Sequence, residues 1–168
     1  MGLKESFDAA LDFEKKGYKI YEETANKTKN PIVARTFGYL ADQELIHIEE
    51  IKEYIKRLNN GHKVELRGDM LEDTKKFFTM TVKEFKEKTE LSDDDLKAHE
   101  SGLHLEKESY NFYKKQHDST DDKELKKFFK WLMKQENVHY EFIQKSYEYI
   151  KNPVGFYTEE EKWMADGG

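Results

Sequence analysis

The sequence predicts an all-α fold, a bundle of four long helices arranged as two helical hairpins joined by one long crossover. Glycine and proline are scarce, at 9 and 2 of 168 residues, and this composition favours helices over strands. Apolar residues also recur at alternating spacings of three and four, the repeat of a helix with one buried face. We expect one domain over residues 1–151, followed by a C-terminal tail over residues 152–168.

The first hairpin is expected to contain two long helices separated by a proline. The first helix runs from about Lys4 to Lys27 and ends before Asn30, because a residue that precedes proline disfavours helical dihedral angles. The second helix begins at Pro31, a favoured first-turn residue. It ends at the segment 59–61, where asparagine and glycine provide left-handed caps.

The second hairpin repeats this plan. Ser92 is a predicted N-cap, and the three aspartates that follow it suit the positive end of a helix dipole. This third helix is expected to end near His117. The polar segment 118–122 forms a turn and a new cap, and the fourth helix runs to about Lys151.

The two hairpins are joined by a long connection over residues 61–91. It opens as a loop and continues as a predicted extra helix through the segment DTKKFFTMTVKEFKEKTE. Two helical hairpins joined by a long crossover form the layout of ferritin-like four-helix bundles.

The composition excludes several classes of protein. A mean hydropathy of −1.00 and the lack of a long apolar run exclude a transmembrane helix. The net charge of −6 argues against nucleic acid as the main partner. The first twenty residues lack the apolar core of a secretory signal, so we expect a cytoplasmic protein. With no cysteine, the 168 residues hold no disulfide, iron–sulfur cluster or rubredoxin-type iron site.

An internal repeat relates the two hairpins. A shift of 92 residues aligns LDFEKKGYKIYEE with LHLEKESYNFYKK, and FGYLADQELIHIEEI with FKWLMKQENVHYEFI, without a gap. The simplest account is a duplicated helical hairpin, so we expect the bundle to have pseudo-twofold symmetry.

The repeat places ionisable residues at the middle of each apolar seam. They are four carboxylates and two imidazoles at one level of the core: Glu14, Glu44, His47, Glu106, Glu136 and His139. An unpaired buried carboxylate costs several kcal/mol, and the seams offer no lysine or arginine at that level. Two divalent metal ions would balance the four carboxylates. The residue pairs 44/47 and 136/139 each lie on one helix face, about 300° apart, so the sequence predicts a carboxylate-bridged dimetal site.

Polar neighbours of these residues have two interpretations. Tyr21 and Tyr113 either pack in the core with a hydroxyl that needs a partner, or orient the metal ligands and relay an electron. Gln43 and Gln135 directly precede two of the glutamates and are expected to lie off the seam, on the flank of each helix.

At these residues the sequence resembles the rubrerythrin branch of the ferritin-like superfamily, over roughly residues 5–150. The segments FEKKGYKIY, DQELIH, LEKESYNFY and KQENVH carry the resemblance. It implies a non-haem di-iron protein that reduces hydrogen peroxide or reacts with dioxygen, commonly as a homodimer. It also implies that the six residues above are the iron ligands, with Glu44 and Glu136 bridging.

Two departures from the family pattern affect the expected function. Typical rubrerythrins have an additional glutamate three residues after the ligand on the third helix, where this chain has Ser109. The usual rubredoxin-like domain is missing from these residues, so electrons would come from a separate donor such as a rubredoxin-like protein.

We therefore expect a peroxide-reducing di-iron oxidoreductase that protects against oxidative stress. The alternative is a ferroxidase or another iron-handling ferritin-like protein. A metal-free structural bundle and an oxygenase acting on an organic substrate remain open, as does manganese or a mixed metal pair in place of iron.

Overall fold

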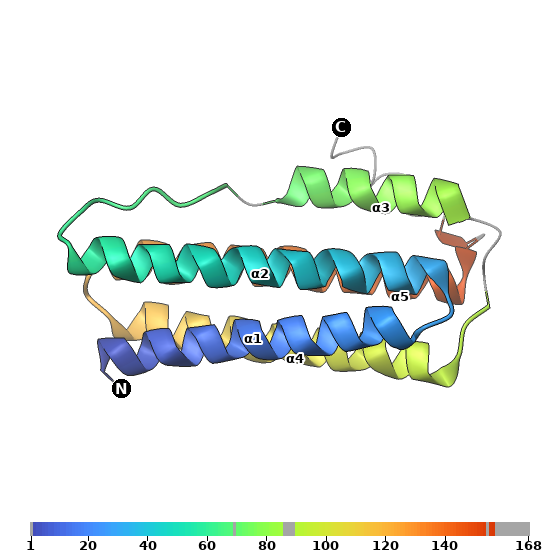
Figure 1. Cartoon of the computed structure of the whole chain (residues 1–168), viewed down its shortest axis with the longest axis horizontal. Helices are drawn as coiled ribbons and strands as arrows, with labels where there is room; N and C mark the ends of the chain where they lie inside the picture. The colour runs from blue at the N-terminus through green and yellow to red at the C-terminus, as the bar shows by residue number, and fades with distance from the viewer. Residues whose placement is uncertain (1, 69, 86–89, 154, 157–168) are drawn as a thin grey trace.

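The structure is a computed structural model that describes residues 2–68, 70–85, 90–153 and 155–156. Within these residues it is all-helical, which confirms the predicted fold class (Figure 1). The five helices in chain order are α1 (Leu3–Lys27), α2 (Pro31–Asn59), α3 (Leu71–Phe85), α4 (Asp93–Ser119) and α5 (Lys123–Lys151).

The ends of the helices follow from capping residues in the sequence. Asn30 accepts hydrogen bonds from two backbone amides of the first turn of α2, and Pro31 opens that helix. Ser92 and Asp95 form a reciprocal capping box at the start of α4. Asp122 caps α5 in the same way as Asn30 caps α2. Gly61 follows α2 with a φ of +69°, a left-handed conformation that favours glycine.

The helices pack as two hairpins lying side by side (Figure 1). α1 pairs with α2, and α4 pairs with α5; α1 also contacts α4, and α2 contacts α5. The crossover helix α3 packs against α2 and α5, on the side away from α1 and α4. The four long helices therefore surround one interior, to which each contributes a face.

The interior is apolar at both ends and polar in the middle. One apolar cluster contains Phe37, Leu40 and Phe142, with Phe78 of α3. The other lies at the opposite end and includes Phe128. Phe156, at the start of the expected tail, is buried and belongs to the first cluster. Residues 154 and 157–168 of that tail lie outside the described residues.

None of the helices in the described ranges combines the length and the apolar character needed to cross a lipid bilayer.

Candidate metal centre

The polar middle of the bundle brings together all six residues that the sequence singles out. Each of the four long helices contributes, and every one of the six side chains is at most 3% exposed. They are Glu14 from α1, Glu44 and His47 from α2, Glu106 from α4, and Glu136 and His139 from α5. The duplicated hairpin therefore forms one shared cluster at the centre of the bundle.

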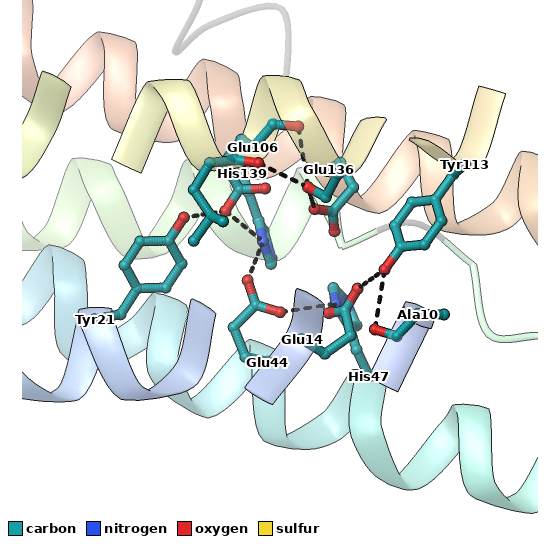
Figure 2. A network of polar contacts seen from close by, with 11 residues as sticks. Ala10, Glu14, Tyr21, Glu44, His47, Glu106, Tyr113, Glu136 and His139 are labelled. Carbon is teal, nitrogen blue, oxygen red and sulfur yellow. Dashed lines mark hydrogen bonds and ion pairs between the residues drawn. The ribbon is translucent and has the colours of Figure 1, made fainter. Parts of the chain in front are cut away.

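Glu44 lies between the two histidines (Figure 2). Its Oε1 is 3.3 Å from Nδ1 of His139, and its Oε2 is 3.6 Å from Nδ1 of His47. The two imidazole rings are nearly parallel, at an angle of 14°, with centroids 5.0 Å apart. One carboxylate thus reaches a histidine from each hairpin, as a ligand shared by two metal positions would.

Each histidine also faces a second glutamate, contributed by α1 or by α4; we call Glu14 and Glu106 the outer glutamates. Nδ1 of His47 lies 3.0 Å from Oε2 of Glu14, and Nδ1 of His139 lies 3.5 Å from Oε1 of Glu106. Candidate ligand atoms of Glu44, His47, Glu136 and His139 all lie within 4.8 Å of one another.

Two tyrosines hold the outer glutamates across the bundle (Figure 2). Tyr113 of α4 donates a hydrogen bond to Oε1 of Glu14, at 2.5 Å, and Tyr21 of α1 donates one to Oε1 of Glu106. Both tyrosines are fully buried. Their hydroxyls therefore find their partners in the candidate ligands themselves, and the two contacts are related by the internal repeat.

Ser109 is the residue whose role the sequence did not reveal. Its hydroxyl donates a hydrogen bond to Oε2 of Glu136. The available signal was its position three residues after Glu106, which puts it on the same face of α4.

The two glutamines that precede Glu44 and Glu136 are buried. Gln43 and Gln135 are only 6% and 2% exposed. A helix within a four-helix bundle contacts neighbours on both sides of its seam, and positions beside the seam are buried as well.

Without metal, burial and neighbouring charges shift the pKa values of the carboxyl groups in the cluster. Burial, together with the neighbouring Glu14, raises the pKa of Glu44 to about 8, and burial beside Glu106 raises the pKa of Glu136 well above its usual range. Burial also opposes ionisation of Glu14, but interaction with Glu44 and hydrogen bonds with His47 and Tyr113 outweigh it and lower its pKa to about 2.

The histidines are held in their charged form by the surrounding carboxylates. Burial alone would lower both pKa values. The hydrogen bond with Glu14 and the contact with Glu44 outweigh it and raise the pKa of His47 to about 9. The charge of Glu106, together with the close contacts of Nδ1 with Glu106 and Glu44, raises the pKa of His139 to about 10. Protons therefore provide the positive charge that the cluster lacks.

The donor set fits divalent metal ions better than it fits protons. Five buried atoms of the cluster make no hydrogen bond of acceptable geometry: Glu44 Oε2, His47 Nε2, Glu106 Oε2, Glu136 Oε1 and His139 Nδ1. Within the described residues, no lysine or arginine pairs with any of the six side chains. Carboxylate oxygens and imidazole nitrogens are suitable ligands for iron or manganese.

Comparison with known proteins agrees with this arrangement. A protein family described as rubrerythrin matches residues 5–147 of the chain. No curated protein and no solved structure gives a significant match.

Proposed function

This chain belongs to the rubrerythrin family, and on that premise we propose that it is an oxidoreductase that reduces hydrogen peroxide at a buried centre of two iron ions. The observation that carries the proposal is the position of Glu44, whose two oxygens face histidines from both halves of the repeat. A shared carboxylate between two nitrogen ligands is the arrangement that a dimetal centre needs.

The proposed ligands are Glu14, Glu44, His47, Glu106, Glu136 and His139, with Glu44 and Glu136 as the expected bridges. Two ferrous ions held there would supply one electron each, the two electrons that the reduction of one hydrogen peroxide to two water molecules requires. The two protons that this reduction also consumes would come from protonated side chains of the cluster or from solvent. Hard carboxylate oxygens stabilise the ferric state that results. The apolar clusters at either end of the centre keep bulk water away from it.

The tyrosines serve this function by orienting the outer ligands. Burial, and the charge of the glutamate that each one faces, raises the pKa of Tyr21 and of Tyr113 well above its usual value. Both phenols therefore keep their protons, and each can fix one oxygen of its glutamate, at Glu106 and at Glu14 respectively. We propose orientation as their main role, and electron relay as a further one.

The oxidised centre must be reduced again. The 168 residues contain no cysteine, so they cannot form a rubredoxin-type site that would deliver electrons internally. We propose that a separate electron donor, such as a rubredoxin-like protein, supplies them. We also propose a homodimer, as the family resemblance implies, located in the cytoplasm.

Rapid mixing of the iron-loaded, reduced protein with peroxide tests this function. We expect oxidation of the centre by hydrogen peroxide to be much faster than oxidation by dioxygen at equal concentration. Protein loaded with Zn²⁺, which has no redox chemistry, is the matched control. Slow oxidation by peroxide would contradict the proposal.

The second candidate function is that of a ferroxidase. It is favoured by Ser109, because this position carries a hydroxyl where peroxide-reducing rubrerythrins typically have another carboxylate. A ferroxidase would prefer dioxygen in the same mixing experiment. If the protein also stored iron, it would accumulate ferric iron beyond two ions per chain.

A further inference from the structure

The internal repeat is broken at one position beside the candidate centre. Gly17 and Ser109 are equivalent under the 92-residue shift, and each follows an outer glutamate of the centre by three residues. Residues three apart lie on one face of a helix, so both positions are directed at the cluster. One of them carries a hydroxyl, and the other carries no side chain.

The hydroxyl of Ser109 holds one oxygen of Glu136. Ser109 is 2% exposed and donates to Oε2 of Glu136, whereas Oε1 of that carboxylate has no hydrogen-bond partner. The same hydroxyl lies 3.0 Å from the carbonyl oxygen of Leu105 and 3.1 Å from that of Glu106. The hydroxyl has a single O–H to donate, and an ionised carboxylate is a stronger acceptor than a carbonyl oxygen. Glu136 therefore accepts the hydrogen bond when its charge is balanced by metal.

The equivalent position on α1 leaves Glu44 without such a donor. A Cβ atom at Gly17 would lie 3.0 Å from Oε1 of Glu44 and 3.1 Å from its Cδ, so this carboxylate packs against bare helix backbone. Both oxygens of Glu44 remain directed at the histidines, 3.3 Å from His139 and 3.6 Å from His47.

We propose that Ser109 is a positioning residue that makes the two halves of the metal centre unequal. Its hydrogen bond occupies Oε2 of Glu136, so that Glu136 binds metal through Oε1. Glu44 instead faces Gly17 and uses both oxygens to bridge the two metal positions. This inference rests on the proposed two-metal centre and revises one part of it, because the repeat alone implies two equivalent bridges.

A cobalt titration separates the two halves. Apoprotein is titrated with Co²⁺ without oxygen, and the visible absorption of the bound ion reports the two dissociation constants. In Ser109→Ala we expect one dissociation constant to rise about tenfold, the usual effect of removing a partner of a metal ligand, and the other to stay unchanged. Ser101→Ala, on the exposed face of the same helix, is the control and leaves both constants unchanged.

Each other outcome overturns the inference. If Ser109→Ala leaves both constants unchanged, the hydroxyl does not act on the metal. If both constants change equally, Ser109 has only a structural role. Ser109→Gly reproduces the equivalent residue Gly17 and must give the same result as the alanine variant, with circular dichroism to establish folding; loss of the fold in both variants also indicates a structural role.

The proposed function fails in a different way. Wild-type protein that binds fewer than two Co²⁺ ions per chain contradicts the dimetal centre itself. Wild-type protein that binds two ions, with constants that Ser109→Ala does not change, contradicts only the role given to Ser109.

Discussion

At the scale of single residues, the hydroxyls of Tyr113 and Tyr21 fix the outer ligands from the opposite hairpin. We expect Tyr113→Phe to lower the affinity for Fe²⁺ or Co²⁺ about 10- to 100-fold, because Glu14 loses the hydrogen bond that orients it. Equilibrium metal titration measures this loss. Tyr110→Phe, half-buried on the same helix, is the matched control and should bind metal as the wild type does. Equal metal affinities of the Tyr113→Phe and wild-type proteins would show that the Tyr113 hydroxyl does not orient Glu14 for metal binding.

Glu44 is predicted to oppose stability while it serves the metal. Its pKa is raised to about 8, mainly by burial, so the metal-free protein at neutral pH must keep a proton that the unfolded chain releases. Glu44→Gln removes this cost, which is about 1.4 kcal/mol for each pKa unit between the unfolded value and the solution pH. We expect the metal-free variant to unfold at a higher temperature than the metal-free wild type. The variant should also lose the metal binding that depends on Glu44 as a shared ligand. A lower unfolding temperature would show that the carboxyl stabilises the metal-free bundle.

Some features of the centre could be predicted from the sequence, and others could not. The spacing of the Glu-x-x-His pairs and the 92-residue repeat were sufficient to select the six buried residues. The contact between Ser109 and Glu136 could not be predicted, because it depends on how closely α4 approaches α5. The burial of Gln43 and Gln135 was missed for a similar reason, since periodicity locates the centre of a buried face better than its width.

At the scale of helices, the four long elements follow closely from local signals. The expected start at Pro31 and the expected ends at Lys27 and Lys151 coincide with the observed bounds, because caps and prolines act over a few residues. Helix α4, the third of the four long helices, continues to Ser119, slightly beyond the expected end near His117. The packing of α3 on α2 and α5 was not predicted, since it depends on contacts distant in sequence.

The crossover helix α3 is attached through Phe78, which is fully buried. Its ring packs edge-on against Phe142 of α5 and against Tyr149. We expect Phe78→Ala to lower the free energy of unfolding by about 3–5 kcal/mol, because it leaves a cavity between α3 and the bundle. Denaturant unfolding measures the loss, and two Fe²⁺ ions should still bind per chain.

Met80 offers the control within the same helix. It is 70% exposed, so Met80→Ala should change the free energy of unfolding by no more than about 0.5 kcal/mol. Similar effects of the two substitutions would contradict the packing of α3.

At the scale of the whole molecule, the metal-free bundle is predicted to lose stability as the pH rises. The folded-state pKa values of Glu44, His47 and His139 are raised to about 8, 9 and 10, so above the unfolded pKa values the folded protein binds more protons than the unfolded chain. Stability is therefore highest below the unfolded pKa of each group and falls as pH rises through the folded value. We expect the unfolding temperature of the apoprotein to fall steadily between about pH 5 and pH 10.

Metal binding is expected to reverse this trend. Two metal ions replace the protons of the cluster, so binding releases protons and becomes tighter as pH rises. Calorimetric scans of the metal-free and metal-loaded protein over the same pH range measure both effects. An unfolding temperature of the apoprotein that rises from pH 5 to pH 9 would contradict the assigned protonation.

The amount of iron that the protein binds tests the central claim most directly. The claim is that six buried side chains, two carboxylates and one imidazole from each hairpin, form one centre for two metal ions. Wild-type protein loaded with Fe²⁺ without oxygen, desalted and analysed for iron is predicted to retain two ions per chain. Retention of one ion or none at neutral pH would contradict it.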